Sequence, residues 1–300
     1  MDTLVKTGSC SIILGKGHYG KFLDEKQNKL LKVTKINDNH DESKNLYIVR
    51  SINNYSDYYS IPDNKVYIIK PDSEFYNYLK QLVNEMNMNI FYGNLECNYV
   101  DYAGNKDVLE TIGDLQEGDY RFWKSYNVIL TFINHILKGL CFLHINKIAH
   151  LDIKTENIMV DTFKNQFKII DFGFCSIEPF DDYVDNIRGT PGYFPKYFST
   201  EKVTAWFPKI KTNDMDLIDG ELPMKKNRSL VYKIDSYCFG RVLHVLKYFY
   251  EFNLTYSCSF RKNKNKSNKE KIEKIIKSLL DNNVNTRLTC MECFKKYFNN

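Results

Sequence analysis

The sequence has little of what marks a membrane-bound or disulfide-stabilised protein. No run approaches the ~20 apolar residues that a membrane-spanning helix needs, and residues 1–7 lack the apolar core of a signal peptide. The eight cysteines are scattered; only Cys290 and Cys293 are close together, and no second pair completes a zinc site. We therefore expect a soluble, intracellular protein of the cytoplasm, with no membrane span and with reduced cysteines.

Charge of one sign is not in large excess either. The chain has 42 Lys and Arg against 37 Asp and Glu, and its net charge of +5 comes from interspersed residues. This balance indicates no dedicated nucleic-acid binding. The 300 residues, 43% of them hydrophobic, suffice for one two-lobed domain or two small domains with a buried core.

The most informative segment is 150–157, His-Leu-Asp-Ile-Lys-Thr-Glu-Asn. It places an acid at Asp152, a lysine two residues later at Lys154 and an amide at Asn157. A predicted hairpin then leads to Asp171, which begins the sequence Asp-Phe-Gly. Because the hairpin would bring the amide and the second acid together, these oxygen ligands suit a hard cation such as Mg²⁺.

This order of residues resembles the catalytic loop and metal-binding motif of eukaryotic-type protein kinases of the serine/threonine branch. The resemblance extends over nearly the whole chain. It implies that Asp152 orients a hydroxyl nucleophile and accepts its proton, and that Lys154 holds the transferred phosphoryl group. It also implies that ATP is the donor and that Asn157 and Asp171 hold Mg²⁺.

The resemblance implies an α+β fold, the two-lobed protein kinase fold with a small β-rich N-lobe and a larger helical C-lobe. We expect the N-lobe, with the glycine-rich loop, at residues 1–103. The C-lobe, with the catalytic loop and activation segment, is expected at residues 104–300, the two forming one kinase domain. The abundance of Asn, Lys, Tyr and Ile suggests an A/T-rich genome such as that of a large DNA virus, in which case the location would be the host cytoplasm.

A strand predicted over residues 9–14 leads into Gly-x-Gly-x-x-Gly at 15–20. Glycines at these places let a tight turn lay its backbone N–H groups over phosphates, although an ordinary glycine-rich hairpin has the same composition. The motif lies between strands and does not precede a helix, which disfavours a Rossmann fold. The resemblance implies that the nucleotide is contacted by Leu14, Gly15, Lys16, Gly17, His18, Tyr19, Gly20, Lys21 and Phe22.

Lys32 stands inside the apolar run 30–33 and should meet an anion, because a buried lysine without a partner is costly. The resemblance implies that this anion is the α/β-phosphate of the nucleotide; the alternative is a lysine extending from an edge strand into water. A helix predicted around 42–53 should supply the glutamate that pairs with Lys32. Glu42 is the best candidate, and the alternative is a solvated acid in the first helical turn.

Residues 98–104 resemble a strand running into the hinge between the lobes. There, Asp101 and Ala103 would present backbone groups to adenine, and Asp107 would reach the ribose. Residues 54–97 follow the family less closely, and we interpret them as an insertion with a strand at 66–69 and a helix at 74–86, without an assigned role.

Residues 188–195, Arg-Gly-Thr-Pro-Gly-Tyr-Phe-Pro, resemble the end of an activation segment. The resemblance implies that the Thr190 hydroxyl bridges Asp152 and Lys154. The family's glutamate that follows this segment is missing, so Arg287, its usual partner, needs another partner or must face water.

Two further features concern the support and control of the loop. Asp235, at the start of a predicted helix, resembles the buried acid that braces the catalytic loop. Leu151 stands where active kinases often have an arginine that pairs with an activation-segment phosphate. Since Ser176 is the only serine or threonine from 174 to 188, we expect activity that does not depend on phosphorylation of this segment.

The function that the sequence predicts is a serine/threonine protein kinase acting on protein hydroxyls, with ATP and Mg²⁺, as a monomer. A pseudokinase or nucleotide-binding scaffold without turnover is the alternative from another class. A small-molecule phosphotransferase on the same fold is disfavoured by residues 189–191, which suit a protein substrate.

Overall fold

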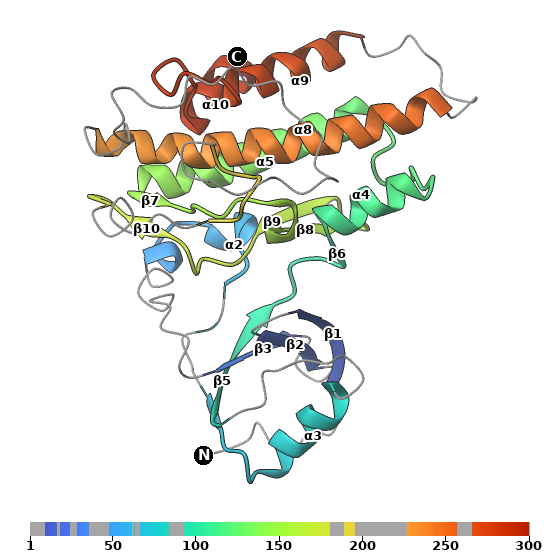
Figure 1. The fold of residues 1–300 in the computed structure, drawn as a ribbon, viewed down its shortest axis with the longest axis vertical. Helices are drawn as coiled ribbons and strands as arrows, with labels where there is room; N and C mark the ends of the chain where they lie inside the picture. The colour runs from blue at the N-terminus through green and yellow to red at the C-terminus, as the bar shows by residue number, and fades with distance from the viewer. Residues whose placement is uncertain are drawn as a thin grey trace. The chain divides into compact units, whose positions relative to one another are not determined.

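A computed structural model of the chain describes residues 10–16, 19–24, 29–35, 48–61, 63, 67–83, 93–180, 189–195, 227–256 and 266–299. The chain divides into two compact units (Figure 1). The first comprises Met1–Tyr47 and Ser60–Tyr102, and the second comprises Ile48–Tyr59 and Ala103–Asn300.

The first unit is built on an antiparallel five-stranded sheet with the order β1-β2-β3-β5-β4. Along β5, Leu95, Cys97 and Tyr99 are buried, which is the alternation expected when one face of a strand packs on a core. Helix α3 contacts β1 and buries Phe75 and Tyr76. The elements are β1 (Cys10–Lys16), β2 (Tyr19–Asp24), β3 (Lys29–Lys35), β4 (Tyr67–Ile69), α3 (Glu74–Val83) and β5 (Leu95–Asp101).

The second unit is mainly helical, and α5 lies at its centre, in contact with α8, α9, α10 and β9. Figure 1 shows α9 and α10 on one side of the α5 and α8 pair and the short strands on the other. Its apolar residues recur at helical spacing and face the core, since Ile129, Phe132, Ile133, Ile136, Leu137 and Leu140 are all buried. The helices are α2 (Tyr55–Tyr58), α4 (Val108–Gln116), α5 (Tyr126–Ile145), α8 (Tyr232–Tyr256), α9 (Lys266–Leu279) and α10 (Cys290–Phe298).

Helix α5 is also long and apolar enough to cross a membrane, judged by length and composition alone. Asn127, Asn134 and Lys138 interrupt its apolar residues, so the expectation that the chain has no continuous run of ~20 apolar residues still holds. Half of its most apolar window is buried inside the protein, against the neighbouring helices and β9. The core of the second unit thus accounts for the apolar stripe of this helix.

Short strands carry the loops of the second unit. A three-stranded sheet has the order β6-β8-β9, and β7 pairs separately with β10. The predicted hairpin is confirmed as β8 and β9, with Ile158 opposite Ile169. The bounds are β6 (Lys106–Asp107), β7 (Ile148–Ala149), the 3₁₀ turn η2 (Thr155–Asn157), β8 (Ile158–Asp161), β9 (Gln166–Ile169), β10 (Ser176–Ile177) and the 3₁₀ turn η4 (Arg228–Val231).

Residues 48–59 join the helical unit although the sequence placed them in the first lobe. The reason is aromatic packing. Tyr59 is 1% exposed, forms an isolated bridge with Ile169 and donates its hydroxyl to the carbonyl oxygen of Gly139. The ring of Tyr58 lies 5.0 Å from that of Phe142 on α5. These contacts tie the segment to the core of the second unit.

Six cysteines are buried free thiols: Cys97, Cys141, Cys175, Cys238, Cys290 and Cys293. Burial raises the pKa of Cys141 and Cys293 to about 12, so both thiols stay protonated and unreactive. Within the described residues, no group of three His, Cys, Asp or Glu side chains could hold a metal ion.

Candidate active site

The two strand pairs of the second unit position residues 150–157. β7 ends immediately before His150 and pairs with β10, with Ala149 opposite Ser176. At the other end, the backbone N–H of Ile170 donates to the carbonyl oxygen of Asn157 at 3.0 Å. This hydrogen bond brings Asp171, the next residue, close to Asn157. The hairpin predicted from the sequence implied this proximity.

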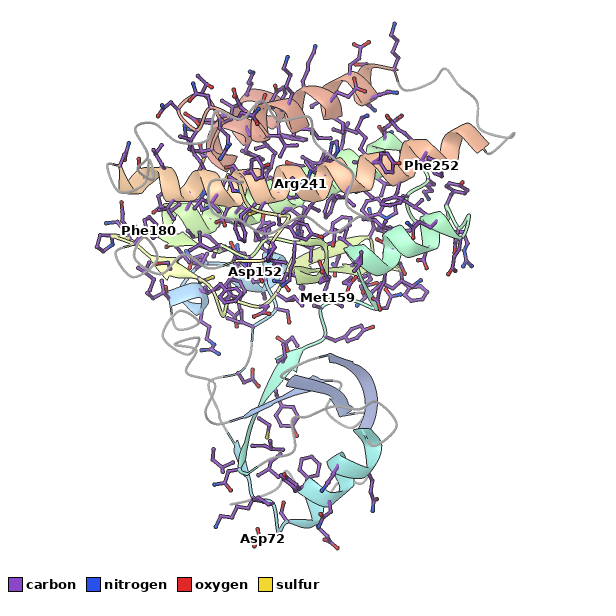
Figure 2. The ribbon with its side chains drawn as sticks, viewed as in Figure 1. Asp72, Asp152, Met159, Phe180, Arg241 and Phe252 are labelled. Atoms are coloured by element: carbon purple, nitrogen blue, oxygen red, sulfur yellow. The ribbon has the colours of Figure 1, made fainter. Side chains whose placement is uncertain are left out.

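Asp152, labelled in Figure 2, is hydrogen-bonded to several charged and polar side chains. Its carboxylate is 4% exposed. Oδ2 accepts from Lys154 Nζ at 2.8 Å and from Asn157 Nδ2 at 2.9 Å, and Oδ1 accepts from the Thr190 hydroxyl at 2.6 Å. Lys154 Nζ also donates to the Thr190 hydroxyl at 2.9 Å. The structure thus brings together four of the residues that the sequence singled out.

The orientation of Asn157 fits a metal ligand. Its Nδ2 donates to both the backbone oxygen and Oδ2 of Asp152, at 2.9 Å each, which leaves Oδ1 as an acceptor. Asp171 supplies a carboxylate whose Oδ1 accepts from the N–H of Gly173 at 3.3 Å. An amide oxygen and one carboxylate suit Mg²⁺, which takes few protein ligands and completes its shell with water and phosphate oxygens.

Two residues in this region adopt left-handed backbone conformations. Leu151 has a φ of 66° and Asp171 a φ of 65°. For residues other than glycine this costs about 1–3 kcal/mol and persists only where the surroundings enforce it. Leu151 directly precedes Asp152, and Asp171 is itself a proposed metal ligand, so the strain lies where the backbone must orient functional side chains.

A buried acid on α8 holds the start of the loop. Asp235 is fully buried, and its carboxylate accepts from the N–H groups of His150 at 2.8 Å and Leu151 at 2.7 Å. His144 Nε2 lies 2.9 Å from Asp235 Oδ2. Burial by itself would raise the pKa of Asp235, but the hydrogen bond and charge of His144, with His150, hold this pKa below its usual value. The predicted brace is therefore an ionised carboxylate beneath the loop.

His150 is fixed as a neutral imidazole. Its Nδ1 accepts the N–H of Asp152 at 3.3 Å, and its Nε2 lies 3.3 Å from the carbonyl oxygen of Ile170, which assigns the proton to Nε2. Burial lowers the pKa of His150 below its usual value. The ring packs 5.0 Å from that of Phe172 and so links the loop to the Asp-Phe-Gly segment.

Residues 190–193 form a tight turn. The N–H of Tyr193 donates to the carbonyl oxygen of Thr190 at 3.2 Å, with Pro191 and Gly192 between them. Gly192 has a φ of 90°. This matches a type II turn, which favours proline at its second position and needs glycine at its third. The sequence Thr-Pro-Gly-Tyr therefore places the Thr190 hydroxyl beside Asp152 by its own turn chemistry.

Tyr193 fastens the other end of this turn. Its hydroxyl is hydrogen-bonded to the hydroxyl of Thr155 and lies 3.3 Å from Glu156 Oε2. Tyr193 is 2% exposed, and its burial raises the pKa of the phenol. Tyr193 was not among the predicted site residues, although a tyrosine three residues after a turn-forming threonine was a visible signal.

The residues expected at the nucleotide base are divided between the two units. In the second unit, Ala103 is buried together with Met159 and Ile170. Met159 lies two residues after Asn157, and Ile170 directly precedes Asp171. Asp107 caps α4, because its Oδ1 accepts from the N–H of Glu110 at 2.8 Å. Its carboxylate is therefore already engaged where a ribose contact was expected.

In the first unit, Lys32 lies in β3, paired with Lys21 in β2 and Asn98 in β5. Since β3 has a neighbour on each side, the alternative of a lysine on an edge strand is wrong. The carbonyl oxygen of Asp101 accepts from the hydroxyl of Ser60 at 2.6 Å.

The glycine-rich loop is described only in its strands. Gly15 pairs with Gly20, and Lys16 pairs with Tyr19. Leu14 belongs to β1, and Phe22 to β2. Gly17, His18 and Glu42 lie outside the described residues, so their roles stay predictions.

Arg287 is buried and does not face water. Its Nε donates to the carbonyl oxygen of Asp281 at 2.8 Å, and its guanidinium lies 4.7 Å from the ring centre of Tyr237. Arg287 is 1% exposed. Backbone carbonyl groups and an aromatic face are therefore among the partners that hold this arginine in a chain lacking the family's glutamate.

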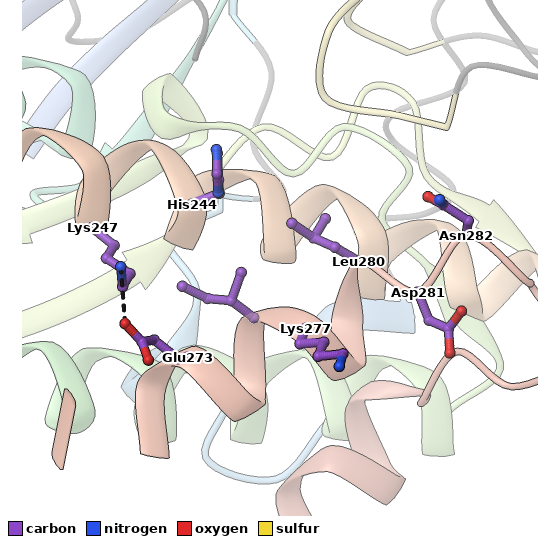
Figure 3. A pocket seen from close by; sticks show the side chains of 8 residues that line it. His244, Lys247, Glu273, Lys277, Leu280, Asp281 and Asn282 are labelled. Atoms are coloured by element: carbon purple, nitrogen blue, oxygen red, sulfur yellow. Dashed lines mark ion pairs between the residues drawn. The ribbon is translucent and has the colours of Figure 1, made fainter. Parts of the chain in front are cut away.

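A separate cavity of about 490 Å³ lies between α8 and α9 (Figure 3). Its acids have partners, since Glu273 pairs with Lys247 at 3.3 Å and Asp281 Oδ2 accepts from the Thr286 hydroxyl at 2.9 Å. The cavity shares no residue with the catalytic loop. It is lined by His244, Lys247, Glu273, Ile276, Lys277, Leu280, Asp281 and Asn282.

Comparisons with known proteins agree with this geometry. The chain is 47% identical over 73 residues to the striated muscle preferentially expressed protein kinase of Danio rerio. This match covers 24% of this chain and 2% of that protein. It is 32% identical over 107 residues to serine/threonine-protein kinase pim-2 of Danio rerio, covering 33% of each chain. It is 30% identical over 166 residues to serine/threonine-protein kinase CLA4 of Candida albicans, covering 53% of this chain and 16% of the relative.

The matched segments span at most a third of these relatives' own lengths. The protein kinase domain as a family matches residues 94–298, from the end of the first unit through α10. The expected α+β, two-lobed kinase fold is confirmed by this match together with the mixed helices and strands. The chain belongs to the protein kinase family.

Proposed function

We propose that the chain is an active serine/threonine protein kinase that transfers the γ-phosphoryl group of ATP to a protein hydroxyl. The observation that carries the proposal is the Thr190 hydroxyl, which lies 2.6 Å from Asp152 Oδ1 and 2.9 Å from Lys154 Nζ. The three side chains form a closed triangle with the 2.8 Å contact of Lys154 Nζ to Asp152 Oδ2. A base and a cation preset at this spacing are what phosphoryl transfer to a hydroxyl requires.

In this mechanism Asp152 orients the substrate hydroxyl and takes its proton, as an ionised carboxylate whose oxygens are fixed by three donors. Lys154 holds the phosphoryl group being transferred. Asn157 Oδ1 and the Asp171 carboxylate would hold Mg²⁺, which supplies positive charge to the phosphate oxygens when bound. Asp235 keeps the loop in place through the N–H groups of His150 and Leu151.

The nucleotide contacts belong to the same proposal. Lys32 would bind the α/β-phosphates, with Glu42 as its partner, and the backbone of the glycine-rich loop would cover the phosphates. Ala103, Met159 and Ile170 offer an apolar surface for the base. Protein substrates follow from the kinase family. Their serine or threonine acceptors are part of the proposal, supported by the relatives named serine/threonine-protein kinases. The monomeric state and cytoplasmic location stay predictions.

The test is incubation of the purified chain with labelled ATP and Mg²⁺, alone and with a generic protein substrate, followed by phosphoamino-acid analysis. We expect label on serine and threonine that is lost when Mg²⁺ is chelated. Nucleotide binding without any label transfer would instead support a nucleotide-binding scaffold. Label on a small molecule but not on protein would support a small-molecule phosphotransferase.

A further inference from the structure

Helix α8 carries an arginine on its buried side. Arg241 is 4% exposed, and its neighbours Phe239, Val242 and Leu243 are buried as well. A guanidinium stays protonated in a protein, so its charge must be met by acceptors when it is buried. Burial lowers the pKa of Arg241 from its usual value, which is the expected sign for a cation taken out of water.

The acceptor lies in the turn that carries Thr190. Arg241 Nε donates to the carbonyl oxygen of Gly192 at 2.9 Å. Gly192 has the positive φ of the turn, which any residue with a Cβ atom adopts only with strain. Arg241 therefore binds the turn at Gly192, the residue whose positive φ the turn requires.

The turn is held at three points. The Thr190 hydroxyl binds Asp152 and Lys154, and the Tyr193 hydroxyl binds Thr155. These two attachments come from the catalytic loop itself. The third, at the Gly192 carbonyl, comes from α8.

The same helix braces the catalytic loop through Asp235, six residues before Arg241. Helix α8 thus carries the Asp235 carboxylate, which accepts from the loop's N–H groups, and the Arg241 guanidinium, which donates to the carbonyl oxygen of Gly192. Because both contacts are made by α8, this helix supports the turn at 190–193 and the catalytic loop together.

We propose that Arg241 is a positioning residue that fixes the 190–193 turn for binding of the protein substrate. This inference rests on the proposed kinase function. Arg241 does not touch the reacting atoms; it acts through Gly192 on the turn. Without the Arg241 hydrogen bond, the turn would become ordered only when the protein substrate binds. The free energy of ordering would then weaken binding and raise the KM for the protein substrate.

The experiment compares wild type with Arg241→Met, which keeps an apolar side chain of similar length but removes the donor. A hydrogen bond from a charged donor predicts a KM for a peptide substrate that is higher by about tenfold or more. The KM for ATP should stay unchanged, and kcat should fall much less than the peptide KM rises. Arg121→Met is the matched control, because Arg121 is an exposed arginine paired with Asp119 on the surface.

A second readout does not need activity. Amide hydrogen exchange should become faster in peptides covering 189–195 of Arg241→Met and stay unchanged in those covering 126–145 of α5. If wild type transfers no phosphoryl group, the proposed function fails, but this exchange comparison still tests the role of Arg241.

Unchanged peptide KM and unchanged exchange at 189–195 would overturn the proposal. So would a loss of kcat alone, with both of these unaffected. If Arg241→Met does not fold, hydrogen exchange of Arg241→Lys tests the proposal instead. Lysine keeps the charge but offers a donor of different geometry, so exchange at 189–195 should be faster than in wild type, and equal exchange would overturn the proposal.

Discussion

The polar side chains around Asp152 are fixed by hydrogen bonds to Asp152 and to one another. Asn157 uses its Nδ2 on Asp152 and keeps Oδ1. Thr190 donates to Asp152 and accepts from Lys154. Side chains that are fixed in this way need little reorganisation when a substrate arrives, which is how positioned groups lower a barrier.

Asp171 is the residue on which the proposed metal site depends most. Replacing it by alanine should abolish Mg²⁺-dependent nucleotide binding, because the proposed site loses its only charged protein ligand. Isothermal calorimetry with and without Mg²⁺ is the measurement. Asp72→Ala is the control, since Asp72 is an exposed acid in the first unit. An affinity of Asp171→Ala that equals wild type with and without Mg²⁺ would exclude this metal site.

The roles of residues that belong to a short sequence motif could be predicted from the sequence. The contacts of Asp152, Lys154, Asn157 and Thr190 are of this kind. Arg241 was not foreseen, because a hydrogen bond between positions 241 and 192 depends on tertiary packing. Its signal was an arginine within the apolar stretch of a helix, which must find an acceptor when buried.

At the scale of elements, α8 is the support shared by the catalytic loop and the turn at 190–193. Its length of 25 residues lets one helix reach both and still contact α9 and α4. The elements themselves were largely predictable where a periodic pattern was strong, as for α5 and the β8–β9 hairpin. Residues 48–59 were misplaced because their unit is decided by the packing of Tyr58 and Tyr59 on α5, which no local pattern reveals.

Strand β10 bears on how the kinase is controlled. Ser176 pairs with Ala149 in this strand and is 8% exposed, so its hydroxyl is not accessible to another kinase. Leu151 is fully buried and offers no positive charge to a phosphate. We therefore expect phosphatase treatment to leave the rate on an added protein substrate unchanged, and Ser176→Ala to remain active. A large loss of rate that returns on rephosphorylation of Ser176 would contradict this expectation.

At the scale of the whole molecule, the half-buried His244 is expected to make stability depend on pH. Burial, with the charges of Arg241 and Lys247, lowers the pKa of His244 to about 4. In the unfolded chain this histidine titrates near about 6.5. Between these values the unfolded state binds the proton and the folded state does not, so the free energy of unfolding falls as the pH falls from about 6.5 towards 4. His150 has a pKa shift of the same sign.

Urea unfolding of wild type and His244→Gln at several pH values checks this sign. Glutamine does not titrate, so the variant should lose less stability than wild type between pH 6.5 and 4. Above about pH 7.5 both should show little pH dependence from this site, because the histidine is neutral in both states. An equal loss in the two proteins on acidification would show that His244 is solvated in the folded state.

The central claim is that Asp152 is the base of an active kinase, and the most direct measurement is the turnover of Asp152→Asn with Mg²⁺, ATP and a protein substrate. The account predicts turnover lower by ~10²–10⁴, the range for a positioned acid–base group. ATP affinity and thermal stability should stay close to wild type, because asparagine keeps the size of the side chain. Turnover of the variant within a few-fold of wild type, with the same amino acids labelled, would contradict the account.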